Sequence, residues 1–462
     1  MSISVNGKQC SNLHFTGIFG SGMSAIAQYL SWQKLSISGS DRLCDSADTS
    51  KIKKHLISCG CSIFPQDGSG ISKETDAVCV SSAIEESNPD IAAARRLNIP
   101  VVHRSDVLAS VVKNKKSIAV AGTSGKSTVT AMIFELLTSS GLSPSLVSGA
   151  ALRSLEQKSL LGNAFCGDSD LLVIEADESD GTLVKYSPCC SIILNLSKDH
   201  KSEAEVLDMF KQLVDQSDWS AVNADDPQLE TIPASISFGF SEKAQFKGKN
   251  LNSSAMLSTV EVQGERYEIP LPGDHNASNL LAALCVCDHF SCDHSRLAQG
   301  AKSYKGVDRR FTIHRTVSGI PVVDDFAHNP EKIRAAISAA KKISKRIIAI
   351  YQPHGFAPTR FLKHEYADMF RNTLHPEDKL CLLPIYYAGG STVMDIESKD
   401  LITLMGDIPF KAFTVSKRRV LLDQISQWAN RGDCVILMGA RDPSLSSFAQ
   451  QIVSSLGGEA GV

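Results

Sequence analysis

A lysine and two hydroxyl residues follow a glycine turn in residues 117–128, which read Ser-Ile-Ala-Val-Ala-Gly-Thr-Ser-Gly-Lys-Ser-Thr. An apolar strand precedes the turn, and a helical pattern follows it through Ser139 and ends at Gly141. Such a loop directs backbone N–H groups and a helix N-terminus at phosphate oxygens. It brings the lysine to the β- and γ-phosphates of a nucleotide and offers the next hydroxyl to Mg²⁺. The segment therefore predicts a nucleotide-phosphate site formed by Gly122, Thr123, Ser124, Gly125, Lys126, Ser127 and Thr128.

Acidic residues follow a second apolar strand, within residues 170–180. A strand of this kind carries a carboxylate to the carboxyl edge of a parallel sheet, where a phosphate loop also lies. Glu175 comes directly after the apolar run, and we expect it to hold Mg²⁺ directly or through water. For Asp177, Glu178 and Asp180, a solvated acidic turn explains the sequence equally well.

A third strand, residues 191–196, leads into Lys198-Asp-His200. Taken alone, His200 is better explained as a hydrogen-bonded loop histidine. The repeated pattern of a strand with a polar end instead indicates that three strand ends meet at one nucleotide and metal site, which suits phosphoryl transfer. Ser127, Glu175 and His200 are then the expected metal ligands.

Length and composition describe a globular protein of several domains. The chain has 462 residues, of which 43% are apolar and 21% charged, and its net charge is -3. At about 150 residues per domain, this length predicts roughly three domains. The nearly neutral charge gives no reason to expect nucleic acid as the main partner.

Neither a membrane span nor a disulfide framework is indicated. No apolar stretch approaches the roughly 18 residues that a span needs, and residues 1–12 lack a signal-peptide pattern, so we expect a cytoplasmic protein without a membrane partner. The 13 cysteines are scattered, with no pair at zinc-ligand spacing. We expect them to be reduced and mostly buried.

The passage from an apolar strand through a glycine turn into a helix occurs in each third of the chain, at residues 13–17, 117–121 and 434–438. This is the pattern of parallel α/β sheets, and it predicts three α/β domains in series. The expected seams at residues 113–116 and 306–311 give domains 1–112, 113–308 and 309–462. Short alternating runs within residues 236–269 predict a small antiparallel side sheet in the central domain.

Taken together, these motifs resemble the Mur ligase family over nearly the whole chain. The resemblance rests on ten short segments in the order that the family shows, namely residues 17–24, 38–41, 80–84, 122–127, 175–180, 199–200, 275–279, 309–311, 324–328 and 351–354. It is strongest for the branch that joins L-alanine to UDP-N-acetylmuramate. Each segment alone is weak, but their common order is specific.

The resemblance implies three domains: an N-terminal Rossmann-like domain for a UDP-sugar, a central P-loop ATPase-like domain, and a C-terminal Rossmann-like domain that brings the amino acid. The UDP-sugar would be bound by Gly17, Gly20, Gly22, Met23, Ser24, Asp41 and Ser82. ATP would also be bound by His275, Asn276 and Asn279. The catalytic set would be Lys126, Glu175, His200, Arg310, Asp325 and His328. Without the family, residues 17–22 are a weak glycine-rich turn, and Asn276 and Asn279 suit an ordinary helix start.

The activity that the resemblance implies is ATP- and Mg²⁺-dependent amide formation by way of an acyl phosphate, in a monomer or weak homodimer. Its amine would be L-alanine, and the alternatives are a different amino acid, a recycled peptide, or a catalytically silent nucleotide-binding relative. Retention of Lys126, Glu175 and His200 argues against a silent relative. A dinucleotide-dependent oxidoreductase is disfavoured because the first glycine turn reads GxxGxG rather than GxGxxG.

Several positions depart from the pattern of the family. Ser124 stands where this branch usually has histidine, Gly355 where relatives usually have arginine, and Arg441 where a glycine is usual. The family's arginines would bind the carboxylate of the incoming amino acid as planar, two-pronged donors. Gly355 therefore leaves the amino acid open, and Arg360 lies further along the chain.

Overall fold

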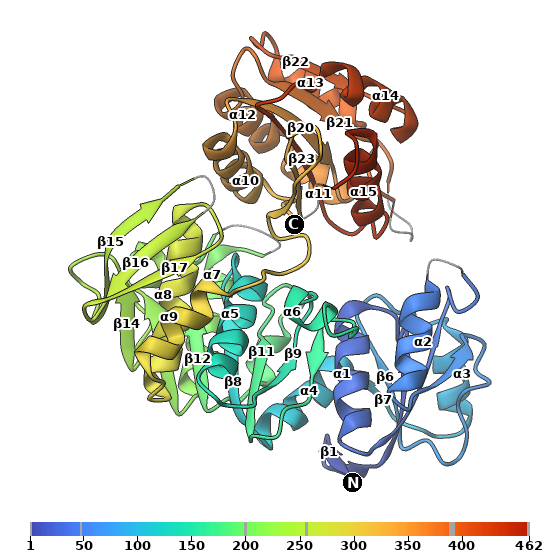
Figure 1. The fold of residues 1–462 in the computed structure, drawn as a ribbon. Coiled ribbons are helices and arrows are strands. Elements are labelled where there is room, and N and C mark those ends of the chain that lie inside the picture. Colours follow the sequence, from blue (N-terminus) through green and yellow to red (C-terminus); the bar gives the residue numbers. More distant parts are fainter. Residues whose placement is uncertain (1, 47–48, 198–200, 255–256, 388–392, 460–462) are drawn as a thin grey trace. The chain divides into compact units, whose positions relative to one another are not determined.

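Parallel strands joined by helices make up most of the chain, as the repeated strand–turn–helix pattern predicts (Figure 1). The computed structural model describes residues 2–46, 49–197, 201–254, 257–387 and 393–459. These form two compact units, and each is described by itself. The first unit comprises Met1–Leu251, Thr259–Ile269 and Ala277–Val307, and the second comprises Asn252–Ser258, Pro270–Asn276 and Asp308–Val462.

The first unit begins with a five-stranded parallel sheet in the order β5-β4-β3-β6-β7. Its central strand β3 is buried over four of its five residues. A short hairpin of β1 (Ile3–Val5) and β2 (Lys8–Cys10) precedes it. The sheet strands are β3 (Asn12–Thr16), β4 (Ser36–Asp41), β5 (Ser62–Pro65), β6 (Ala77–Val80) and β7 (Val101–His103), and the helices are α1 (Ser21–Trp32), α2 (Ser50–Ser58), α3 (Pro89–Arg96) and α4 (Arg104–Lys113).

A ten-stranded sheet follows, in the order β10-β9-β11-β8-β12-β13-β14-β15-β16-β17. Its middle strands are parallel and buried, as the apolar runs before the polar strand ends predict. The first group of strands is β8 (Lys116–Ala121), β9 (Ser145–Val147), β10 (Ala164–Phe165), β11 (Leu171–Glu175), β12 (Cys190–Ile193) and β13 (Trp219–Asn223). The second is β14 (Ile236–Gly239), β15 (Phe246–Ser253), β16 (Ser258–Val262) and β17 (Glu265–Ile269).

The second group of strands lies where a small antiparallel side sheet was expected. Strands β14 to β17 continue the edge of the large sheet, and β14 pairs in parallel with both β13 and β15. The alternating pattern correctly indicated strands in this segment. It could not indicate that they join the central sheet, because alternation reports exposure and not the strand partner.

Helices cover this sheet and follow the sequence signals for their ends. Helix α7 begins at a capping box in which Ser202 and Glu205 satisfy each other's backbone amides. The helices are α5 (Lys126–Ser139), α6 (Arg153–Glu156), α7 (Glu203–Asp215), α8 (Asp274–His289) and α9 (His294–Lys302), with short 3₁₀ turns at η2 (Thr182–Lys185) and η3 (Pro227–Leu229). Helix α5 contacts β8, β11 and α9, so the helix after the phosphate loop is anchored on both sides.

The seam expected at residues 113–116 lies inside the first unit. One hydrophobic core includes buried residues of both sheets, and helix α1 contacts β9 and β10. A buried polar bridge reinforces this contact. The Asn163 side-chain amide donates to the Ser21 carbonyl at 2.7 Å and to the Ser24 hydroxyl at 2.9 Å, and its oxygen accepts from the Gln28 amide at 3.0 Å.

The second unit is built on a six-stranded sheet in the order β18-β19-β23-β20-β21-β22. Its longest segment begins at Asp308, within the second expected seam. Its strands are β18 (Thr312–His314), β19 (Val322–Asp325), β20 (Arg346–Gln352), β21 (Lys379–Leu382), β22 (Lys411–Thr414) and β23 (Asp433–Gly439). Its helices are α10 (Pro330–Ile343), α11 (Phe356–Phe361), α12 (Lys363–Thr373), α13 (Ser398–Met405), α14 (Arg418–Trp428) and α15 (Leu445–Ser455).

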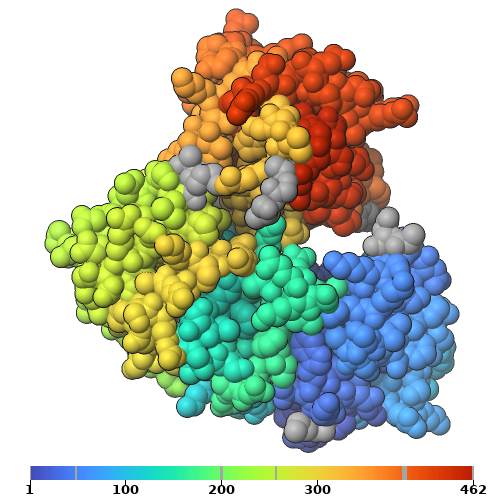
Figure 2. Space-filling view, in the orientation of Figure 1, coloured from blue at the N-terminus to red at the C-terminus, as the bar shows by residue number. Residues whose placement is uncertain are grey.

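Two separate hydrophobic cores lie on the two faces of this sheet. Helices α10, α12 and α13 supply one core, and α14 and α15 supply the other. In the space-filling view, the residues of this unit that are drawn in orange to red form its surface on the face that is seen (Figure 2). Strands β20 and β23 are covered on both faces, so their carboxyl ends are held rigidly. The exact domain bounds 1–112, 113–308 and 309–462 stay a prediction.

The cysteine prediction agrees with the structure. All 13 cysteines are free, and most are buried. Within the described residues, no helix is both long enough and apolar enough to cross a membrane.

The bridge at Asn163 gives a first prediction. Asn163→Ala should lower the free energy of unfolding by about 1–3 kcal/mol, because it leaves buried hydrogen-bonding groups of α1 without partners. Gln157→Ala, at an exposed residue nearby, should change it by less than about 0.5 kcal/mol. Urea or thermal unfolding of the two variants measures the difference. Equal stability of both variants would contradict the role given to Asn163.

Candidate active site

The phosphate loop connects β8 to α5, and its two glycines are required by their surroundings. Gly122 has φ +142° and Gly125 has φ +87°. A Cβ on Gly122 would lie 2.9 Å from the Leu194 Cβ, and one on Gly125 would lie 2.7 Å from the Asn279 side-chain oxygen. Gly125 is also the N-cap of α5, so no side chain caps the first amides of this helix. The start of α5 thus presents backbone donors that no side chain caps, which suits an anion.

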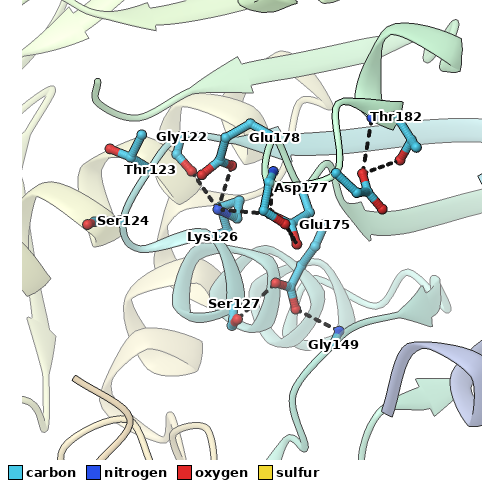
Figure 3. A network of polar contacts seen from close by, with 12 residues as sticks. Gly122, Thr123, Ser124, Lys126, Ser127, Gly149, Glu175, Asp177, Glu178 and Thr182 are labelled. Atoms are coloured by element: carbon cyan, nitrogen blue, oxygen red, sulfur yellow. Dashed lines mark hydrogen bonds and ion pairs between the residues drawn. The ribbon is translucent and has the colours of Figure 1, made fainter. Parts of the chain in front are cut away.

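Lys126 is held among carboxylates at the start of α5 (Figure 3). Its Nζ donates to Glu178 Oε2 at 2.7 Å and to the Gly122 carbonyl at 2.8 Å, and it lies 3.6 Å from Asp177 Oδ1. Burial acts to lower the pKa of Lys126, but the negative charges of Glu178 and Asp177 raise it above its ordinary value. Lys126 is therefore a cation that is already paired. A phosphate group that binds it would have to replace the Glu178 carboxylate.

Glu175, at the end of β11, faces Ser127 in the same network (Figure 3). Its Oε2 accepts from the Ser127 hydroxyl at 2.9 Å. Its Oε1 accepts from the Ser148 hydroxyl at 2.6 Å and from the Gly149 amide at 2.9 Å. Hydroxyl and carboxylate oxygens are ligands that Mg²⁺ prefers. Over the part of the chain that is described, no three His, Cys, Asp or Glu side chains form a metal-binding group by themselves.

The acidic turn after Glu175 has defined partners, which decides between the two explanations that the sequence left open. Glu178 is 5% exposed and pairs with Lys126, and Asp177 lies close to the same ammonium. Asp180 forms an ion pair with Arg104 at 3.1 Å, at the start of α4. The solvated-turn explanation is therefore wrong for Glu178 and Asp180, and the motif links the loop to the N-terminal sheet.

Asn195 is a loop-ordering residue that the sequence analysis did not single out. Its side-chain oxygen accepts from the Ser124 amide at 2.8 Å and from the Thr123 hydroxyl at 3.0 Å. Its amide donates to the Ser124 carbonyl at 3.0 Å. Asn195 follows β12, which pairs with β8, so a polar residue just after a buried strand was the available signal. His200, further along the same segment, lies outside the described residues.

Helix α8 carries the three residues expected near ATP. Asn279 is buried, and its side chain packs against Gly125 of the phosphate loop. Asn276 donates from its amide to the Pro272 carbonyl at 2.7 Å. His275, in the second unit, lines a cavity of about 240 Å³ together with Gly273, Asp274, Ala335, Ser338, Ala339 and Lys342. Their binding roles stay predictions, as does that of Thr128, which is buried in α5.

The N-terminal glycine turn is a second candidate binding loop. Gly17 has φ +77°, and its amide and that of Ile18 donate to the Ser40 carbonyl. Asp41, at the end of β4, accepts from the Phe19 amide at 3.1 Å and from the Leu43 amide at 3.0 Å. Gly20 is the N-cap of α1 and provides no side-chain cap. Asp41 thus fixes the shape of the turn, which leaves an uncapped helix start beside it.

The other residues expected at a UDP-sugar lie in different surroundings. Met23 and Ser24 are buried in α1, and the Ser24 hydroxyl bonds the Ser21 carbonyl at 3.0 Å. Gly22 contacts the Arg104 side chain, and Ser82 is exposed in a turn after β6. Met23 and Ser24 therefore pack the helix. Whether any of these residues binds a ligand stays a prediction.

In the second unit, the carboxyl ends of β19, β23 and β20 meet side by side. Asp325 pairs in register with Met438, and Gly439 pairs with Gln352. Asp325 accepts from the Phe311 amide and from the Ala327 amide, each at 2.7 Å. Burial raises the pKa of Asp325 to about 6, although the charge of Arg310 opposes the rise. The pKa of the Asp325 carboxyl therefore lies close to neutral pH.

Aromatic and imidazole rings surround these strand ends. The Arg310 guanidinium lies 4.8 Å from the centre of the Phe326 ring. His328 bonds the Phe326 carbonyl through Nδ1 at 2.9 Å, and its ring meets that of His354 edge to face at 4.9 Å. Burial lowers the pKa of His328 well below its ordinary value, so its imidazole is neutral. By contrast, Arg309 is buried and supports the fold through Asp324 at 3.1 Å.

Comparison with protein families gives three matches that follow one another along the chain. The model described as "Mur ligase family, catalytic domain" matches residues 12–116. The model "Mur ligase middle domain" matches residues 120–287. The model "Mur ligase, glutamate ligase domain" matches residues 309–441. Together they span most of the chain in the order that the sequence analysis expected.

Three similar proteins share one name. A UDP-N-acetylmuramate–L-alanine ligase of Rhizobium etli is 31% identical, over 97% of this chain and 98% of that protein. One from Acaryochloris marina is 32% identical, over 93% of each. A crystal structure of UDP-N-acetylmuramate-alanine ligase from Thermotoga maritima has a TM-score of 0.79 and 26% identity, and the match covers 96% of this chain and 98% of that one.

The raised pKa of Asp325 predicts a pH-dependent stability. Folding favours the protonated carboxyl, so the stabilisation is fully present below about pH 4 and is lost as the pH rises through about 6. Because one pH unit corresponds to about 1.4 kcal/mol, the loss is at most about 3 kcal/mol. Asp325→Asn lacks this titration, so the stability of the wild type relative to the variant should fall between pH 4 and pH 7. Thermal unfolding across this range measures it, and a constant difference would contradict the assignment.

Proposed function

Because the chain belongs to the Mur ligase family, we propose that it uses ATP to join L-alanine to UDP-N-acetylmuramate. The observation that carries the proposal is the network of Lys126, Ser127 and Glu175 at the phosphate loop. The shared name of relatives that match nearly the full length supports the choice of substrates. The cytoplasm supplies ATP, so we place the reaction there.

The phosphate loop is the proposed ATP site. Gly125 and the uncapped start of α5 offer backbone donors to the phosphates, and Lys126 offers a cation. Ser127 and Glu175 would hold Mg²⁺, whose chemistry is to neutralise charge on the phosphates. Their oxygen atoms fit this ion, because Mg²⁺ is usually bound by one or two carboxylates together with substrate phosphates and water. Asn195 keeps the loop in shape through three hydrogen bonds.

The first step activates a carboxylate. An oxygen of the UDP-N-acetylmuramate carboxylate attacks the γ-phosphorus of ATP, and ADP leaves with the electrons of the broken bond. Lys126 would exchange Glu178 for a phosphate oxygen, which places its charge where negative charge develops. Among the ion pairs described for Lys126, only that with Glu178 is shorter than 3.0 Å. The exchange therefore breaks one close ion pair.

The second step forms the amide. The neutral amine of L-alanine attacks the acyl carbon, and inorganic phosphate leaves from a tetrahedral intermediate. Arg310, Asp325 and His328 are the residues of the second unit proposed to serve this step. The neutral state of the His328 imidazole lets it hydrogen-bond an ammonium or amine without adding a positive charge. The glycine turn at Gly17 and Gly20 is the proposed site of the UDP group.

A second candidate amine is favoured by one observation. Gly355 stands at the start of α11, where the resemblance leads one to expect an arginine for the amino acid carboxylate. A related ligase with a different amino acid or a peptide as its amine therefore remains the alternative. Phosphate release from ATP, measured with UDP-N-acetylmuramate and each amine in turn, separates the two. Release stimulated by L-alanine supports the proposal, and release only with another amine supports the alternative.

Removal of the Lys126 charge tests the proposed ATP site. Lys126→Met should lower kcat/KM for ATP by about a hundredfold to a thousandfold, because a cation that stabilises the transferred phosphoryl group is lost. The matched control is Lys243→Met, at an exposed lysine of the same unit that pairs with Glu230. It should keep wild-type activity. A Lys126→Met enzyme with unchanged kcat/KM would rule out the proposed role.

Asn195 gives a prediction about binding rather than chemistry. Asn195→Ala should weaken ADP binding by about tenfold, since the Ser124 backbone loses both of its hydrogen bonds to this side chain and the loop is no longer held in shape. Isothermal titration calorimetry measures the change. Asn223→Ala, which removes a bond to the Leu194 carbonyl just after β12, is the control for a general loss of packing. Equal effects of both changes would contradict a specific role for Asn195.

A further inference from the structure

Arg441 has an unusual backbone conformation for an arginine. It follows β23 and has φ +64°, in the left-handed region that favours glycine. The Asp442 amide bonds the Ala440 carbonyl at 2.8 Å, so Arg441 is the central residue of a three-residue turn with positive φ. Such turns are rare and strained for residues other than glycine. A strained residue at a strand end suggests a function for its side chain.

The fold does not use this side chain. Arg441 is exposed, and no hydrogen bond or ion pair to it is found among residues 2–46, 49–197, 201–254, 257–387 and 393–459. The adjacent acid, Asp442, is already bonded to Arg418 and Ser444. Arg360, in helix α11, is bonded to Asp395 and to the Val393 carbonyl. Of these three arginines, Arg441 is the one whose donors are not used by a protein group.

Gly355 lies beside this guanidinium. A Cβ on Gly355 would be 3.7 Å from Arg441 Nη1, although the two residues follow different strands. The register explains the contact, because Gln352 at the end of β20 pairs with Gly439 at the end of β23. Gly355 has φ +151° and ψ 156°, a conformation that is essentially restricted to glycine, so an arginine is disfavoured there. The guanidinium of Arg441 thus lies against the place from which a side chain at residue 355 would project.

We propose that Arg441 binds the α-carboxylate of the amino acid substrate and so supplies, from β23, the cation that Gly355 cannot carry. The inference rests on the proposed function, in which an amino acid presents its amine to an acyl phosphate. A guanidinium recognises a carboxylate through two parallel N–H donors, which fixes the orientation of the amino acid as well as its charge. The position agrees with this role, since ligands of open α/β sheets bind beyond the carboxyl ends of the strands.

Because the backbone of Arg441 is strained, its side chain can be removed without destabilising the protein. Arg441→Gly removes the guanidinium and places glycine where the backbone favours it, so the thermal midpoint should stay equal or rise. The KM for L-alanine should increase by about tenfold to a hundredfold, while the KM values for ATP and UDP-N-acetylmuramate stay unchanged. Arg441→Lys keeps the charge without the planar fork and should fall between the two enzymes. Arg315→Ala, at an exposed arginine of the same unit, is the control and should keep the KM of the wild type.

L-Alaninamide, which lacks the carboxylate, separates recognition of the carboxylate from a structural role. It should react equally well with the wild type and with Arg441→Gly. An unchanged KM for L-alanine in Arg441→Gly, or an equal loss with L-alaninamide, would overturn the inference. If the wild type responds only to another amine, the proposed amino acid is wrong, and the same comparison with that amine and its carboxyl amide decides the role of Arg441. If no amine stimulates phosphate release, the proposed function and the inference both fail.

Discussion

The burial of the Lys126 ammonium among carboxylates is the constraint on which the rest of the central site depends. A charge removed from water must be paired and hydrogen-bonded, and here Glu178 and the Gly122 carbonyl satisfy it. The pairing holds the lysine at the start of α5, where its loop presents uncapped amides. The negative charge of Glu178 stabilises Lys126 when no ligand is bound, and the charge of a phosphate group can take its place. Stability and reactivity at this site therefore rest on one ion pair.

The order of the strands brings residues that are far apart in the sequence into this arrangement. Strand β8 lies between β11 and β12, and all three run in parallel. The phosphate loop, Glu175 and Asn195 lie at the ends of these three strands, so they come to one edge of the sheet. The second unit repeats the principle with β19, β23 and β20, whose ends bring together Asp325, Arg441 and Gly355.

The sequence was sufficient for the fold class and for the part of the site that lies at the ends of apolar strands. The α/β architecture and the meeting of Lys126, Ser127 and Glu175 followed from strand ends and loop chemistry. The role of Glu178 could not be predicted in this way. The sequence of an acidic turn is the same whether its carboxylates are solvated or form a buried ion pair. Asn195 was passed over because its partners, Thr123 and Ser124, lie in the loop that follows another strand. The contact between Gly355 and Arg441 depends on the register of two strands, which no local pattern reports.

The central claim is that this phosphate loop activates a carboxylate as an acyl phosphate. The most direct test is to supply UDP-N-acetylmuramate whose two carboxylate oxygens are ¹⁸O, with ATP and L-alanine, and to analyse the inorganic phosphate by mass spectrometry. The oxygen that attacks phosphorus must leave with the phosphate when the amine attacks carbon. The account predicts one ¹⁸O atom in each phosphate released in amide formation. Phosphate without ¹⁸O, at an equal yield of amide, would contradict it.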